Sequence, residues 1–126
     1  MEVKTSTKEK FHVITVITPH LTANMTAQLN EGLFALLQTN IRNIVLNLKA
    51  VSKIDEEAAE ALVKMQQMFY EQSSSFVICE LQPDVESFLD EKDLLEIINS
   101  TPTESEAGDI VQMEEIEREL FNDEDE

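Results

Sequence analysis

Four carboxylates lie close together near the middle of the chain, and their type and spacing are the ones best suited to chemistry. They are Asp55, Glu56, Glu57 and Glu60. Paired carboxylates can act as general acid and general base. A cluster at the start of a helix is more often a solvated first turn that opposes the positive end of the helix dipole. We therefore predict no catalytic residues here and interpret the chain as a binding module rather than an enzyme.

Other patterns for catalysis, nucleotide binding and metal binding are missing from the sequence. Gly32 and Gly108 are the only glycines, so the chain has neither a glycine-bordered nucleophile turn nor a phosphate-binding loop. His12 and His20 lack a His or Cys partner at the spacing of metal ligands. The single cysteine, Cys79, lies in an apolar segment that is typical of a buried side chain. We expect no cofactor and no metal.

Composition indicates one acidic globular domain. The 126 residues are 42% hydrophobic, enough for one core without disulfides, and 26 acids against nine Lys and Arg give a net charge of −17. Such a polyanion repels nucleic acid and anionic membranes, so neither is an expected partner. The polar amino end does not resemble a signal peptide, and no apolar run reaches the roughly 20 residues of a membrane span. We expect a cytoplasmic protein.

Strands and helices are predicted to alternate along the chain. Strands are expected at residues 11–17, 44–48 and 75–80, with shorter or weaker ones near 20–21 and 95–99. Helices are expected at about residues 24–38, 55–71, 83–91 and 110–122. A long loop is expected from 99 to 108, and residues 122–126 are expected to form a disordered acidic tail after a single domain over 1–121. The alternation predicts an α/β fold with a mixed four- to five-stranded sheet and about four helices packed against it.

The segment from Asn43 to Leu62, NIVLNLKAVSKIDEEAAEAL, resembles the signature of the STAS domain. This is the family of bacterial anti-sigma factor antagonists and of sulfate-transporter tails, in which a buried strand, a short loop containing Asp, and a helix follow one another. Residues 21–24 and 76–85 are similar to further segments of the family, so the resemblance covers about residues 11–100. It implies a single STAS-like domain that binds another protein.

In that family, the Ser or Thr immediately after the Asp is phosphorylated by a partner anti-sigma kinase, and phosphorylation blocks the partner interface. The Asp matches Asp55, but Glu56 stands at the acceptor position and Ala58 stands where the family has Gly. Ser52 lies three residues before Asp55 and does not match the acceptor. The resemblance thus implies a site that cannot be phosphorylated, with Glu56 as a permanent but partial mimic of phosphoserine.

The resemblance implies two alternative partners, and the sequence does not decide between them. One is an anti-sigma factor or related kinase-fold protein, and the other is the ATPase of a lipid-transport ABC system, to which the chain would attach as a standalone STAS subunit. A homodimer is also left open. The predicted partner-binding residues are Ser52, Lys53, Asp55, Glu56, Glu57, Ala58, Glu60 and Lys64. The competing interpretation is that Asp55 caps the helix and that Glu56 and Glu57 only favour its dipole.

Overall fold

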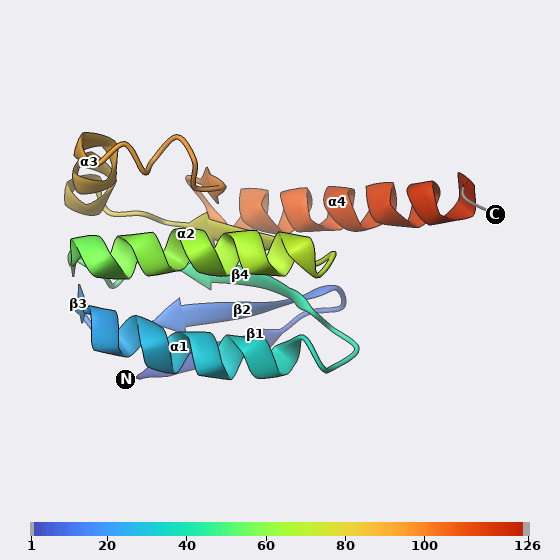
Figure 1. The fold of residues 1–126 in the computed structure, drawn as a ribbon, viewed down its shortest axis with the longest axis horizontal. Coiled ribbons are helices and arrows are strands. Elements are labelled where there is room, and N and C mark those ends of the chain that lie inside the picture. The colour runs from blue at the N-terminus through green and yellow to red at the C-terminus, as the bar shows by residue number, and fades with distance from the viewer. Residues whose placement is uncertain (1, 125–126) are drawn as a thin grey trace.

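A five-stranded mixed sheet with helices on both faces forms the protein (Figure 1). The computed structural model describes the backbone of residues 2–124 and the side chains of residues 2–121. The strand order is β1-β2-β4-β6-β7, in which β1 is antiparallel to β2 and the other neighbours are parallel. The strands are β1 (Val3–Thr7), β2 (Phe11–Val16), β4 (Asn43–Asn47), β6 (Phe76–Cys79) and β7 (Ser100–Thr101). A separate two-stranded ladder joins β3 (His20–Leu21) and β5 (Lys53–Ile54). The predicted α/β architecture is confirmed.

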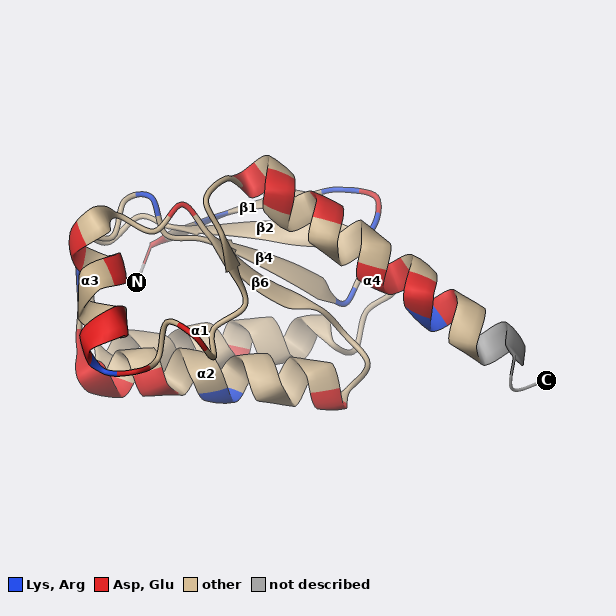
Figure 2. Ribbon diagram, turned by 90° about the horizontal axis from the view of Figure 1, so that it is seen from above, with Lys and Arg blue, Asp and Glu red and all other residues tan. Residues whose placement is uncertain are grey.

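Helices α1 (Ala23–Leu36) and α2 (Glu56–Glu71) pack side by side on one face, and α4 (Glu104–Glu124) lies on the other (Figures 1 and 2). Alternate residues of β4 serve the two faces: Ile44 and Leu46 join the core under α1 and α2, whereas Val45 packs with Val111 of α4. This burial on both faces explains the continuous apolar run of β4. Helix α3 (Pro83–Glu91) contacts β5 at the end of the molecule where α2 begins.

The amino end forms an edge strand that the sequence did not predict. All five residues of β1 are exposed, and their pairing with β2 runs from Val3 opposite Val16 to Thr7 opposite His12. Backbone hydrogen bonds rather than burial therefore hold β1 in place. Val3, Thr5 and Thr7 also have the β-branched side chains that strands favour. A strand without a buried face leaves no apolar alternation in the sequence.

The predicted strand at 95–99 is wrong in position. The chain turns there, because the N–H groups of Ile97 and Ile98 both donate to the Leu94 carbonyl. Ile98 still reaches the core from this turn. The strand that pairs with β6 is the two-residue β7, which has too little length for a periodic signal.

The predicted loop at 99–108 is too long, because α4 begins at Glu104. The Thr103 hydroxyl accepts a hydrogen bond from the Glu106 N–H at 3.2 Å, as expected of a helix N-cap. Gly108 lies inside α4, where a Cβ atom would come within 2.9 Å of the Phe11 ring. This glycine thus permits close packing of α4 on β2 and does not mark a loop.

The carboxyl-terminal end of the chain leaves the tail prediction open. The backbone of α4 continues to Glu124, and residues 125–126 lie outside the described residues. The domain limits of 1–121 and the tail of 122–126 therefore stay predictions. Across residues 2–124, none of the helices combines the length and apolar character needed to cross a membrane.

Candidate functional site: the start of α2

The β3–β5 ladder fixes the loop that leads into α2. The N–H of Ser52 donates to the Pro19 carbonyl at 2.8 Å, and the N–H of Asp55 donates to the Leu21 carbonyl at 3.1 Å. Leu21 and Ile54, paired across the ladder, are both buried. The residues before α2 are therefore held by the segment after β2, and the first turn of the helix has a defined position.

Asp55 occupies the N-cap position of α2, but its side chain does not cap the helix. In the described part of the chain, its carboxylate makes no hydrogen bond to the first-turn N–H groups of the helix. Asp55 Oδ1 instead lies 2.7 Å from His20 Nε2, and both side chains are about 40% exposed (43% and 40%). His20 was considered only as a metal ligand, so this contact was not predicted, and the competing interpretation that the Asp55 side chain caps the helix is wrong.

The remaining predicted residues surround this pair. Ser52, Lys53, Glu56, Glu57, Glu60 and Lys64 are exposed, whereas Ala58 is fully buried against the core. The site therefore presents three exposed carboxylates in the first two turns of α2. Figure 2 shows acidic residues at this end of both α2 and α3. Ala58 cannot touch a partner in this conformation.

Glu56 has only a weak internal partner. Its Oε1 lies 3.9 Å from Lys92 Nζ just after α3, and the two side chains are 54% and 40% exposed. An ion pair of this length and exposure contributes about 0–1 kcal/mol to stability. Glu56 is consequently available to an incoming group at little energetic cost.

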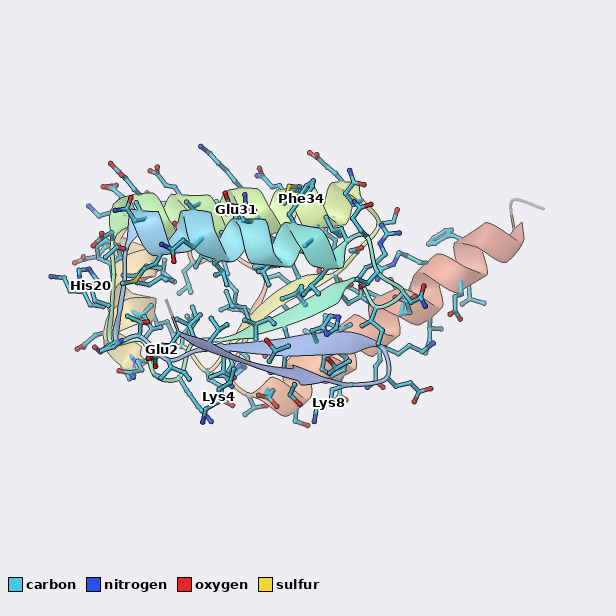
Figure 3. The ribbon with its side chains drawn as sticks, turned by 90° about the horizontal axis from the view of Figure 1, so that it is seen from below. Glu2, Lys4, Lys8, His20, Glu31 and Phe34 are labelled. Carbon is cyan, nitrogen blue, oxygen red and sulfur yellow. The ribbon has the colours of Figure 1, made fainter. Side chains whose placement is uncertain are left out.

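A groove of about 340 Å³ lies between α1 and α2 next to these acids. Glu57 and Lys64 line it together with small and flexible apolar side chains, including Ala27, Ala61 and Met65. The sequence could not show this groove, because its two walls come from separate helices. His20 lies at the end of the molecule where α1 begins, as Figure 3 shows.

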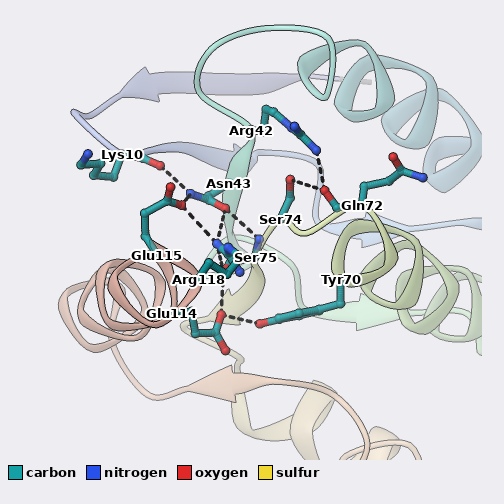
Figure 4. Close-up of polar contacts among 10 residues, drawn as sticks. All are labelled: Lys10, Arg42, Asn43, Tyr70, Gln72, Ser74, Ser75, Glu114, Glu115 and Arg118. Atoms are coloured by element: carbon teal, nitrogen blue, oxygen red, sulfur yellow. Dashed lines mark hydrogen bonds and ion pairs between the residues drawn. The ribbon is translucent and has the colours of Figure 1, made fainter. Parts of the chain in front are cut away.

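A second group of polar residues lies at the other end of the sheet and has a structural role (Figure 4). Asn43 of β4 donates to Glu115 Oε2 at 2.8 Å and to the Lys10 carbonyl at 2.9 Å. Arg118 donates to Asn43 Oδ1, Ser75 Oγ and Glu115 Oε2 at 3.0–3.2 Å. These bonds fasten α4 to the starts of β4 and β6.

Two ionisable side chains in this cluster, Glu115 and Tyr70, have pKa values shifted from their usual ones. Burial acts to raise the pKa of Glu115, but the hydrogen bonds from Asn43 and Arg118 and the Arg118 charge outweigh it and hold that pKa below its usual value. Burial, reinforced by the Glu114 carboxylate 2.8 Å from its hydroxyl, raises the pKa of Tyr70 to about 12. Tyr70 is therefore neutral at physiological pH and donates to Glu114.

Cys79 is buried, as its apolar setting predicted. Burial, followed by the negative charges of Glu104 and Glu80, raises the pKa of its thiol to about 12. A thiol of this kind is a poor nucleophile and a poor metal ligand. Among the described residues, no three His, Cys, Asp or Glu side chains are grouped so as to hold a metal ion.

Comparison with known proteins places the chain in a family. Residues 2–107 match the family model described as the STAS domain, so the chain belongs to the STAS domain family. The resemblance predicted from residues 43–62 is confirmed at this level. No curated protein matches the chain.

Solved structures share the fold at low sequence identity. An anti-sigma-factor antagonist (STAS) domain protein from Planctomyces limnophilus is 20% identical, with a TM-score of 0.69 over 83% of this chain and 93% of that one. A serine-to-glutamate variant of RsbS from Moorella thermoacetica is 17% identical, with a TM-score of 0.73 over 89% and 96%. The anti-sigma factor antagonist SpoIIAA in its unphosphorylated form is 17% identical, with a TM-score of 0.69 over 88% and 96%. At these identities the likeness concerns the fold alone.

Proposed function

We propose that this protein is a non-catalytic interaction module of the anti-sigma factor antagonist type, acting in transcription regulation in the bacterial cytoplasm. It binds an anti-sigma factor or related kinase-fold regulator through the start of α2. The observation that carries the proposal is the exposed acidic first turn, in which Glu56 and Glu57 follow an Asp55 held by His20. The neighbouring loop is anchored by backbone hydrogen bonds, which lowers the entropy cost of ordering it in a complex.

The module works without a serine phosphorylation switch. Glu56 stands where the family resemblance expects the phosphorylated hydroxyl, and it carries one negative charge where phosphoserine carries nearly two. The nearest hydroxyl upstream, that of Ser52, donates to the Pro19 carbonyl at 3.3 Å within the loop. The state of the interface is therefore constant instead of being set by a kinase.

Charge defines the kind of surface that fits this site. The exposed carboxylates of Glu56, Glu57 and Glu60 are bordered by Lys53 and Lys64. A complementary partner surface is mainly basic at its centre, and its association rate and affinity fall as salt screens these charges.

Affinity capture with paired variants tests the proposal. The site variant is Glu56→Gln/Glu57→Gln, and the control is Glu31→Gln/Glu71→Gln, which removes two exposed charges elsewhere on α1 and α2. From a lysate of the native cell, wild type and control should retain a kinase-fold anti-sigma regulator identified by mass spectrometry. The site variant should retain at least tenfold less of it. Recovery of an ABC ATPase in its place would contradict the proposal and favour the transporter-subunit alternative.

The absence of a switch needs its own measurement. The captured regulator, purified and incubated with ATP, should place no phosphate on residues 52–60. Phosphate found there by peptide mass spectrometry would overturn this part of the proposal while leaving the binding surface intact.

A further inference from the structure

The second half of α4 extends past the sheet and past residues 2–107, which match the family (Figure 1). Over the described residues 111–121, only one side of this helix is covered. Val111 is fully buried against β4 and β6, and Arg118, seven residues later, faces the polar cluster of Asn43 and Ser75. The side chains on the opposite side of the helix are exposed to solvent.

An apolar stripe occupies this open side. Met113, Ile116 and Leu120 recur at intervals of three and four, which places them on one helix face, and Phe121 lies beside Leu120. Their exposed fractions are 61%, 57%, 58% and 67%. Four of the seven exposed large hydrophobic side chains in the described residues thus lie on one end of one helix. Such clustering marks an interaction surface, whereas single exposed apolar residues do not.

Acidic residues border the stripe. Glu106 and Asp109 precede it, and Glu117 and Glu119 flank it, all of them exposed. Within α4 there are nine acids and one base, and that base, Arg118, is engaged in the polar cluster. Figure 2 shows the acidic residues distributed along the helix. The surface is therefore apolar at its centre and negative at its edges.

These charges decide between occupants. A second copy would bring one acidic α4 against another, in either orientation, and the repulsion would oppose the burial of the stripe. Anionic lipid headgroups are repelled for the same reason. A helix with apolar residues at three- and four-residue spacing and flanking Lys or Arg satisfies both the stripe and its edges.

We propose that the open face of α4, formed by Met113, Ile116, Leu120 and Phe121, is a docking surface for a basic amphipathic helix of a partner protein. Next to it, a groove of about 320 Å³ between α4 and the β1–β2 hairpin is lined in part by Phe11 and Ile116. This groove gives room for an apolar side chain of the partner. Lys8 and Lys10 on the hairpin also line the groove, together with Glu9, Glu115 and Glu119. The edge facing the hairpin is therefore mixed in charge, and the negative edge that a basic helix would contact lies along α4.

The docking surface and the start of α2 lie at opposite ends of the molecule (Figure 1). Occupation of one does not cover the other, so the protein can join two partners as an adaptor. The docking surface stands independently of the function proposed for α2.

Fluorescence anisotropy with a model helix tests the docking surface. The probe is a fluorescein-labelled peptide of two KLAKLAK repeats, compared with one in which Ser replaces each Leu. The stripe variant of the full chain is Ile116→Gln/Leu120→Gln, and the control is Phe34→Gln/Ile97→Gln, which removes exposed apolar side chains elsewhere (Figure 3 shows Phe34). Circular dichroism is used to check that each variant is folded.

Wild type, the control and Glu56→Gln/Glu57→Gln should bind the Leu peptide alike. The stripe variant should bind it at least tenfold more weakly, and the Ser peptide should bind all four proteins no better than the stripe variant binds the Leu peptide. Equal binding of the Leu peptide by stripe variant and wild type would show general attraction to a polyanion and overturn the proposal. So would a wild-type mass by light scattering of twice 14.3 kDa that returns to 14.3 kDa in the stripe variant, because a second copy would then be the occupant.

Discussion

At the scale of single residues, the pairing of His20 with Asp55 changes what the acidic cluster can do. An aspartate at an N-cap normally accepts a hydrogen bond from the helix backbone, but this carboxylate accepts one from the imidazole Nε2 at 2.7 Å. The side chain is thereby oriented beside Glu56 and Glu57 without being used to stabilise the helix. A residue of β3 therefore fixes the position of one carboxylate, that of Asp55, at the start of α2.

The cost of removing Asp55 should therefore be small. Asp55→Ala is expected to lower the free energy of unfolding by less than about 1 kcal/mol, because it removes one partly exposed polar contact, when measured by urea titration. Thr103→Ala is the control, because the Thr103 hydroxyl does cap α4, and its loss should cost about 1 kcal/mol or somewhat more. A loss of about 2 kcal/mol for Asp55→Ala would show that Asp55 caps α2 in solution.

At the scale of elements, α4 is attached by two different kinds of contact. Ala107, Gly108 and Val111 pack against the apolar face of β2, β4 and β6, and Glu114, Glu115 and Arg118 make the polar bonds one to two turns further on. The polar cluster sits where the covered half of α4 gives way to the half that projects. It fixes the direction of the open stripe relative to the sheet.

This attachment should weaken in acid. The folded state holds the pKa of Glu115 below its unfolded value of 4.5, so the folded protein binds fewer protons. Its contribution is fully present above that unfolded value and is lost as the pH falls through the lower, folded one. Urea unfolding from pH 7 to pH 3 should show a steeper loss of stability for wild type than for Glu115→Gln, which should cost about 1 kcal/mol at pH 7. Parallel curves for the two proteins would contradict the assignment.

At the scale of the whole molecule, the net charge of −17 opposes folding as well as association with other anions. Favourable pairing offsets little of it, because the described residues contain two ion pairs of Lys or Arg with Glu, and both are partly exposed. Salt that screens these charges should therefore weaken the repulsion between acids more than it weakens the attraction within ion pairs.

Added salt should raise the thermal stability. Between roughly 20 and 300 mM NaCl the Debye length falls from about 20 Å to below 8 Å, and we expect the unfolding midpoint to rise by a few degrees. Calorimetry near pH 4.3, the isoelectric point, provides the control, because the rise should vanish there. A midpoint that falls with salt at pH 7 would show that attractive pairs dominate.

The sequence alone determined the elements whose side chains are buried in a regular pattern. Strands β2, β4 and β6 and helices α1, α2 and α3 were predicted close to their observed bounds, because burial on one or two faces imposes a period on the residues themselves. The acidic start of α2 was predicted for the same local reason. The order of these elements was enough to suggest the family.

Only the tertiary structure decided the features that depend on residues far apart in the chain. His20 and Asp55 are 35 positions apart, and Asn43 and Glu115 are 72 apart, so no local period could pair them. The edge strand β1 depends on hydrogen bonds to β2 rather than on apolar side chains, and β7 is only two residues long. The open face of α4 could not be predicted for the same reason. Its apolar spacing predicted a helix, but which side of that helix the sheet covers is set by Gly108, Val111 and Arg118 meeting partners in β2, β4 and β6.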